Sequence, residues 1–302
     1  MKTKHLGWLL LAVFTVSCAG PQTRTLNIAD GIMKSNSDPN LSEVRSLAAR
    51  FAEKDFTTTR LAQYPDAGLD RLYDALFRVS FFFPEHPSSV DFQARVLGEK
   101  LRRGHKIDSD IERMHKSYIG ARRFTDAATI AGRFPGLKYS YIPPTLTDET
   151  TGAAAWRAYG IPGSFEKVVL KPLPLGRGPR IVISMFPGCE ITEAAVEEIL
   201  ADPVLSPLFR EYGMLLTLRF DPRSMTLWRD HFNFPEVYIA YKPSDFPGFD
   251  FDFSPSIYFL QDGKIKHSVS GWRRNQNPNF GMDEMHKGLS AISITTASYT
   301  AP

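Results

Sequence analysis

The sequence predicts two folded regions of different class, an all-α helical domain over residues 41–136 and an α/β domain over residues 180–295. Apolar residues recur at helical spacing throughout the first region. Prolines interrupt residues 137–179, which marks this segment as a domain junction, and the short β-branched run over 168–170 is expected to form a first strand or half of a hairpin. From Arg180 onward, runs of β-branched residues alternate with a helical segment, the order expected of a sheet covered by helices.

The helical domain opens with an amphipathic stripe. Its apolar side chains occupy positions i, i+3, i+4, i+7 and i+8, namely Val44, Leu47, Ala48, Phe51 and Ala52. Four more segments with apolar stripes follow before Pro135. The run from Tyr118 to Ala127 resembles the inner part of a tetratricopeptide repeat, although no second copy follows at a period of about 34 residues. The domain is therefore expected to be either a small bundle that packs on its neighbour or a peptide-binding groove.

The α/β domain starts with a strand, a helix and a second strand. The strand over 181–185 leads through a short turn to Cys189, a helix follows over 191–200, and the next strand spans 214–220. In a strand–helix–strand unit of a parallel sheet, functional groups gather where a strand ends and the next helix begins. This order places Cys189 at such a junction.

The end of the domain carries a hairpin signal. Pro255 precedes a strand over 256–260, and Asp262-Gly263 then predicts a tight turn into an antiparallel strand over 265–269. A short helix around Met285 is expected to cover one face of the sheet.

This order of elements resembles the thioredoxin-like superfamily over residues 165–295. The resemblance places Cys189 at the family's attacking cysteine, in a Cys-x-x-Thr sequence in which Thr192 replaces the resolving cysteine. Pro255 matches the family's cis-proline, which stands beside the active cysteine and presents a backbone edge to the substrate chain. The sequence departs from the family at Gly188, where a tryptophan is usual, and at Ile183, where a buried aspartate is usual. The resemblance thus implies a monothiol site formed by Cys189, Thr192 and Pro255.

Two opposing influences act on the stability of a Cys189 thiolate. The start of a helix stabilises a thiolate, and the Thr192 hydroxyl one turn later is placed to donate a hydrogen bond to it. The charges of Glu190 and Glu193 oppose a thiolate. Cys189 is therefore either a reactive thiol or a small buried residue in a silent thioredoxin-like fold.

The first residues predict an export signal over 1–17. Lys2 and Lys4 precede a short apolar stretch that is too short to span a bilayer. The sequence from Thr15 to Cys18 resembles the lipobox of bacterial lipoproteins, which implies a lipid on Cys18 and an anchor in the outer membrane facing the periplasm. Cleavage by an ordinary signal peptidase is the alternative. The polar residues 18–40 are expected to form a flexible tether.

Composition narrows the classes of partner. With 36 basic and 33 acidic side chains the chain is close to neutral, which argues against a nucleic-acid partner. No histidine pair has metal-ligand spacing and no glycine-rich phosphate loop is present, so we expect neither metal nor cofactor. His231 is expected to be a packed or surface residue rather than a base. The alternating aromatic residues over 246–253 predict an edge strand, with a substrate-facing lip as the alternative.

The sequence therefore predicts a membrane-anchored, thioredoxin-like lipoprotein of the bacterial cell envelope. Its expected activity is thiol–disulfide exchange with protein thiols or disulfides of exported proteins, through Cys189. The alternative is a catalytically silent lipoprotein whose helical domain binds a partner in envelope assembly.

Overall fold

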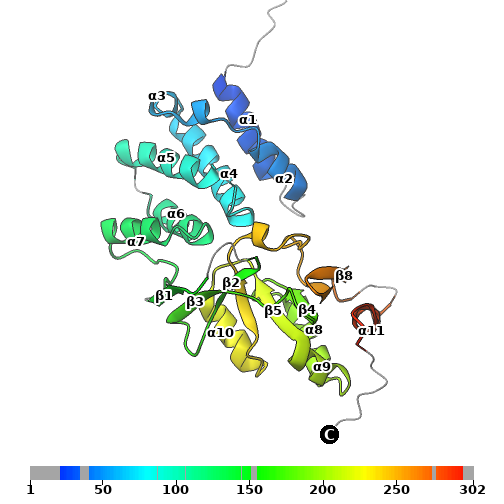
Figure 1. Ribbon diagram of the computed structural model, residues 1–302. Helices are drawn as coiled ribbons and strands as arrows, with labels where there is room; N and C mark the ends of the chain where they lie inside the picture. Colours follow the sequence, from blue (N-terminus) through cyan, green and yellow to red (C-terminus); the bar gives the residue numbers. More distant parts are fainter. Residues whose placement is uncertain are drawn as a thin grey trace, which may run out of the picture.

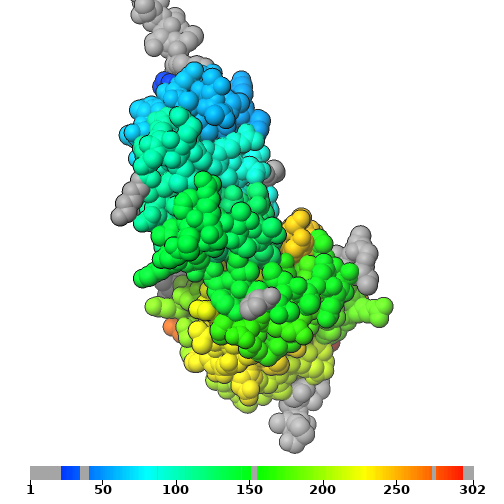
Figure 2. Space-filling view, turned by 90° about the vertical axis from the view of Figure 1, so that its left-hand side faces the viewer, coloured from blue at the N-terminus to red at the C-terminus, as the bar shows by residue number. Residues whose placement is uncertain are grey.

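The structure is a computed structural model that describes residues 21–34, 41–86, 88–105, 107–143, 145–150, 155–273 and 277–294. The helical elements of the N-terminal half lie at one end of the molecule and the sheet with its helices lies at the other (Figure 1). In the space-filling view the helical half is seated on the α/β half (Figure 2). The prediction of a helical region followed by an α/β region is confirmed.

The helical region contains seven α-helices and one short 3₁₀ helix among the described residues. They are α1 (Pro21–Lys34), α2 (Leu41–Ala48), η1 (Glu53–Phe56), α3 (Thr58–Leu61), α4 (Asp66–Phe82), α5 (Ser89–Arg102), α6 (Asp108–Gly120) and α7 (Phe124–Arg133). Aromatic packing joins η1 to α5, because the rings of Phe56 and Phe92 stack 4.1 Å apart.

Helix α1 corrects the prediction of a flexible tether over 18–40. Residues 21–34 form a helix, and its buried side chains Thr25, Ile28, Ala29 and Ile32 stand at helical spacing. Ile28 and Ile32 belong to the same apolar core as α4. This helix was not predicted because polar residues outnumber the apolar residues over 21–34. Residues 18–20 and 35–40 lie outside the described part of the chain.

The sheet has eight strands in the order β1-β3-β2-β6-β5-β4-β7-β8. Their bounds are β1 (Thr145–Asp148), β2 (Arg157–Gly160), β3 (Lys167–Pro172), β4 (Pro179–Ser184), β5 (Gly213–Thr217), β6 (Val237–Ala240), β7 (Ser256–Gln261) and β8 (Lys264–Ser270). Strands β4, β5 and β6 run parallel, and β7 is antiparallel to β4. The central strand β4 therefore has β5 on one side and the β7–β8 hairpin on the other.

The junction predicted over 137–179 contributes three strands to this same sheet. Strand β2 pairs with β3 and also with β6, both antiparallel, and β1 pairs parallel with β3. The sheet thus begins at Thr145 rather than at residue 180. Strands of four to six residues between prolines leave little periodicity, which is why only the run around 168–170 was visible in the sequence.

One face of the sheet is covered by helices and the other by loops. Helices α8 (Glu190–Ala201), α9 (Leu205–Tyr212), α10 (Pro222–His231) and α11 (Phe280–Ala291) bury apolar residues with Ile181 and Ile183 of β4. The opposite face, which carries Val182, is covered by residues 173–175 and by the segment after the 3₁₀ helix η2 (Pro243–Asp245).

The aromatic segment over 246–253 is not an edge strand, contrary to the prediction. Phe246 and Phe251 are buried against the sheet, and the ring of Phe249 stacks on Tyr258 of β7 at 4.2 Å. Phe253 alone of these four phenylalanines is largely exposed, at 59%. Gly248 has a φ of +84°, so the segment folds back on itself and cannot extend along a sheet edge.

Candidate functional site

Cys189 lies between the end of β4 and the first turn of α8. Gly188 precedes it with a φ of +84°, a conformation that disfavours any larger residue and accounts for the glycine where thioredoxins carry tryptophan. Cys189 is the N-cap residue of α8, and its carbonyl oxygen accepts hydrogen bonds from the N–H groups of Thr192 and Glu193, each at 3.0 Å. The sulfur is therefore held where a helix dipole favours negative charge.

The peptide bond between Ser254 and Pro255 is cis, as the resemblance implied, and it lies beside Cys189. The sulfur of Cys189 is 3.6 Å from the carbonyl oxygen of Ser254, to which the thiol donates. The Ser254 hydroxyl lies 2.8 Å from the hydroxyl of Thr192 and accepts a hydrogen bond from the Phe186 N–H at 2.9 Å. Segments more than 60 residues apart in sequence thus meet at one sulfur.

Ser254 belongs to this site but was not predicted from the sequence as one of its residues. Its place directly before Pro255, the expected cis-proline, was the signal that pointed to it. Thr192 is fully buried, so its hydroxyl needs a polar partner, and Ser254 supplies that partner.

The surroundings of Cys189 lower the pKa of its thiol. Burial, the largest single influence, opposes ionisation, but hydrogen bonds from the side chains of Thr192 and Ser254 and from the backbone N–H groups of Thr192 and Ile191 outweigh it. A hydroxyl has one proton, so when Thr192 and Ser254 bond to each other, one of the two protons is still free for the sulfur. The two hydroxyls can therefore stabilise a Cys189 thiolate by a hydrogen bond.

Cys189 is the one free cysteine in the described part of the chain. The position of a resolving thiol is occupied by the buried Thr192. A thiol without a resolving partner can form a mixed disulfide but cannot close an internal one. The geometry therefore permits monothiol exchange and excludes a dithiol cycle between Cys189 and the position that Thr192 fills.

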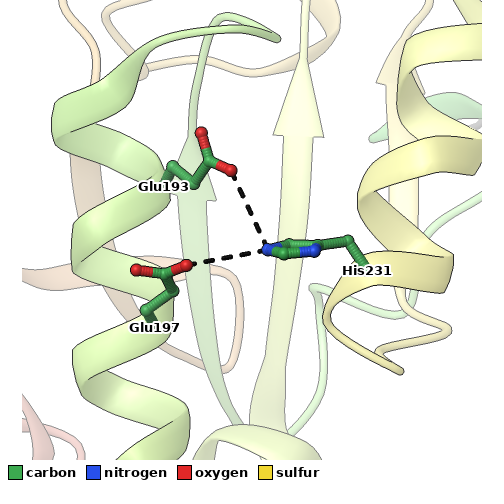
Figure 3. A group of neighbouring side chains, drawn as sticks. All are labelled: Glu193, Glu197 and His231. Carbon is green, nitrogen blue, oxygen red and sulfur yellow. Dashed lines mark ion pairs between the residues drawn. The ribbon is translucent and has the colours of Figure 1, made fainter.

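His231 faces two carboxylates across the surface near the site. Its Nε2 lies 3.8 Å from Glu193 Oε1 and 3.6 Å from Glu197 Oε1, with the two glutamates one turn apart on α8 and His231 at the end of α10 (Figure 3). The three ligand atoms lie within 4.8 Å of one another. Sequence reasoning missed this group because 34 residues separate Glu197 from His231.

The three side chains are each about half exposed, and the ion pairs account for their positions. No hydrogen bond from another described residue orients the far side of the His231 ring, as the surroundings of a built metal centre do. The group therefore has the contacts of a surface cluster rather than those of a built metal centre.

The predicted lipidation site, Cys18, lies outside the described residues, as does the whole expected signal over 1–17. Among the residues that are described, no helix is both long and apolar enough to cross a bilayer.

Comparison with known proteins yields one structural likeness to report. No protein-family model matches the chain, and no curated protein matches it. A solved crystal structure of a thioredoxin-like protein from Bacteroides caccae matches at 13% identity and a TM-score of 0.28, covering 93% of this chain and 99% of the other. The strand order, Cys189 at the start of α8 and the cis-proline before β7 are observed in this chain itself, independently of that likeness.

Proposed function

We propose that this chain is a monothiol thiol–disulfide exchange protein of the bacterial cell envelope, acting on exported proteins. The observation that carries the proposal is the sulfur of Cys189, held at the start of α8 against Ser254 of the cis-proline segment, with its thiol pKa lowered. A thiolate is the nucleophile in disulfide exchange, and a lowered pKa raises its fraction near neutral pH.

The reaction is a two-electron exchange that needs no cofactor. The Cys189 thiolate attacks one sulfur of a client disulfide, a bond forms between the two sulfurs, and the other client sulfur leaves as a thiolate that takes up a proton from water. A thiol of the same client that attacks the mixed disulfide releases Cys189 and leaves the client isomerised. If an external thiol instead attacks the Cys189 sulfur of the mixed disulfide, the client leaves as a thiolate and is fully reduced. A second external thiol then attacks the disulfide that Cys189 forms with the first, which releases Cys189 and leaves the two external thiols joined as a disulfide.

A lipid on Cys18 would hold this site at the membrane surface. Helix α1 begins at Pro21, three residues after Cys18, and packs into the helical core. The helical region would then lie directly against the membrane, with the α/β domain beyond it. Metabolic labelling with a radioactive fatty acid tests the anchor, and Cys18→Ser is expected to abolish the label.

The exchange reaction is tested by the rate of Cys189 alkylation against pH and by reaction with the neutral reagent 2,2′-dithiodipyridine. We expect an alkylation midpoint below that of free cysteine and a mixed disulfide of the expected mass on the wild-type protein. Cys189→Ser is the matched control and should give neither. A midpoint at the value of free cysteine, together with no disulfide-linked clients on non-reducing gels of envelope extracts, would contradict the proposal.

A second candidate function is a silent binding factor, in which Cys189 plays no chemical part. The observation that favours it is a cavity of about 660 Å³ where the helical region meets the α/β domain. Cys189→Ser separates the two functions, because a binding factor keeps its partner in a co-purification when the thiol is removed, whereas disulfide-linked clients are lost.

A further inference from the structure

The cavity between the two halves is built from both of them. Helices α4 and α6 and residues 139–141 form the helical side, and residues 218–223, residues 251–252 and Phe186 form the side of the α/β domain. Its volume of about 660 Å³ lies within the roughly 300–1,000 Å³ typical of ligand pockets. The space is large enough for several side chains of a bound polypeptide.

Aromatic side chains form part of the cavity wall. Phe81, Tyr141, Phe186 and Phe220 all line it, and Phe81 is 49% exposed although it is a large apolar residue. Tyr141 and Phe186 are partly buried and Phe220 is buried, so Phe81 is the most accessible of these four rings. An exposed aromatic ring at the wall of a hollow is suited to bind an apolar side chain.

Three cations of the cavity make no ion pair with the described acidic side chains. They are Lys116, Arg219 and Arg223, all of which line it. The guanidinium of Arg219 lies 4.7 Å from the centre of the Phe81 ring, and that of Arg223 lies 4.4 Å from the centre of the Tyr141 ring. Both guanidinium groups are thus held on aromatic walls, an arrangement that leaves their N–H edges to bind a carboxylate.

The two acidic residues of the cavity are already engaged. Asp221 accepts hydrogen bonds from the N–H and the hydroxyl of Ser224 at the start of α10, at 3.1 and 2.7 Å. Asp252 forms an ion pair with Arg45 at 3.4 Å. The hydrogen bonds to Ser224 orient Asp221 but leave its charge, so Lys116, Arg219 and Arg223 face one uncompensated carboxylate and the net charge of the cavity is positive.

The cavity is continuous with the segments that hold the Cys189 site. Phe186 lines the cavity while its N–H donates to the hydroxyl of Ser254. Asp252 lines it two residues before Ser254. A polypeptide lying along residues 252–254 with a sulfur at Cys189 would place neighbouring side chains in this cavity.

We propose that this cavity is the specificity pocket for the clients of Cys189, and that it takes an acidic residue adjacent to an aromatic residue near the client cysteine. The inference rests on the proposed exchange function. The client carboxylate binds Arg219 and Arg223, and the client ring packs on Phe81 and Phe220.

The test measures binding without chemistry. The Cys189→Ser protein is titrated into a fluorescent peptide that carries Asp-Phe beside a serine in place of cysteine, with anisotropy as the readout. Peptides with Asn-Phe, Asp-Ala and Lys-Phe are the comparisons. We expect the Asp-Phe peptide to bind at least about tenfold more tightly than each of them, with affinity that falls as salt is raised.

The matching protein variant is Arg219→Gln combined with Arg223→Gln, which should weaken Asp-Phe binding by about tenfold or more. Lys266→Gln, an exposed cation on β8, is the control and should bind as the parent does. Should the double variant lose its native circular dichroism, Lys116→Gln alone makes the same test with a smaller expected loss.

Equal binding of the Asp-Phe and Asn-Phe peptides would overturn the pocket assignment. So would binding of a free aromatic acid such as 3-phenylpropionate by a protein that binds none of the peptides. Neither result touches the exchange function, which is measured separately by the reaction of wild-type Cys189 with the neutral 2,2′-dithiodipyridine.

Discussion

The two halves of the molecule bury different kinds of polar groups. The helical region buries ionisable side chains, namely Asp55, Glu99, Lys100, Asp110 and His115. The buried polar residues described in the α/β domain are all hydroxyls, namely Ser184, Thr192, Thr217 and Ser256. One half is thus tied together by charges in its core, whereas the other keeps its interior apolar and places hydroxyls at the strand ends and the site.

Asp110 is the centre of the charged network. Its carboxylate contacts both Lys100 and Arg113, and Lys100 also pairs with Asp70 at 2.7 Å. These contacts join α4, α5 and α6. Helix backbones satisfy their hydrogen bonds internally, so side chains must set how helices align, whereas the ladder between strands aligns a sheet through the backbone itself. This difference explains why the buried charges lie in the helical half.

The two halves can be followed separately during unfolding. Trp156, Trp228 and Trp272 all lie in the α/β domain, and the described helical region contains no tryptophan. Far-UV circular dichroism reports mainly the helical region, because α1–α7 hold most of the described helical residues and α8–α11 contribute the smaller share. Tryptophan fluorescence reports the α/β domain. The predictions below use both signals to test whether charge matters in one half and not in the other.

The largest effect is expected for Asp110→Asn. Lys100 and Arg113 lose their shared carboxylate and keep only the partly exposed Asp70 and Asp74. The cost in unfolding free energy should therefore lie near the lower end of the roughly 3–5 kcal/mol expected when one side of a buried pair is removed. We expect the circular dichroism transition in urea to shift to lower concentration accordingly. Lys287→Met, which breaks the exposed pair with Glu284, is the control and should cost less than about 1 kcal/mol. Equal costs for the two variants would refute the comparison.

The second largest effect is expected from acidification, which should destabilise the helical half. Burial holds the pKa of His115 at about 4, below its ordinary value of about 6.5, so the unfolded chain binds a proton that the folded one does not. Its contribution is complete above pH 6.5 and falls by about 3 kcal/mol as the pH drops to 4. Relative to His115→Leu, the wild type should lose stability between about pH 7 and pH 4.5.

The pH range over which His115 changes the stability lies above the range for Glu99. A hydrogen bond from Arg102, the leading cause, lowers the pKa of Glu99 to about 2, so the contribution of Glu99 is lost only as the pH falls from about 4.5. Urea midpoints at pH 7, 6 and 5 therefore isolate the histidine. A constant difference between wild type and His115→Leu over this range would show that the buried imidazole is not the acid-sensitive group.

Arg122 connects the two halves and should have the next largest effect. One guanidinium nitrogen donates to the carbonyl oxygens of Leu218 and Ala240, at 2.6 and 2.8 Å, and the other donates to Gly120 at 2.8 Å. Burial lowers the pKa of Arg122 to about 10, which leaves the group charged at neutral pH. We expect Arg122→Met to cost about 2 kcal/mol.

The diagnostic result for Arg122→Met is the separation of the two unfolding transitions. Circular dichroism and tryptophan fluorescence should report different urea midpoints once the link is lost. Arg122→Lys, which keeps the charge but not the fork of donors, should separate them partly. Coincident transitions in both variants would show that the halves are coupled by other contacts.

The smallest effect is expected at the hydroxyls of the α/β domain. Thr192→Val removes a hydrogen-bond donor from the thiolate, so the pKa of Cys189 should rise and its alkylation at pH 7 should slow, with little change in the fluorescence transition. Thr192→Ser keeps the hydroxyl and is the matched control. Identical pH profiles of Cys189 alkylation in Thr192→Val and Thr192→Ser would show that the Thr192 hydroxyl does not influence the Cys189 thiol.

Local patterns predicted the framework of the site. The strand before Cys189, the helix after it and the hairpin at Asp262-Gly263 are each signalled by neighbouring residues, and each is present. Strands β1, β2 and β6 were not predicted, and β3 was predicted only as a short strand around 168–170, because strands of four to six residues gain their stability from the strands beside them. The cis-proline segment was predicted through the family resemblance rather than through periodicity.

The sequence by itself determined the two classes of region, the position of Cys189 at a helix start and the lack of a resolving thiol, because these depend on residue types and spacings within a few turns. The tertiary structure decided what surrounds that sulfur. Ser254 comes from 65 residues away, Arg122 reaches two strands from a helical turn, and the cavity takes its walls from both halves. Such contacts depend on packing between distant segments, for which a single sequence carries no local signal.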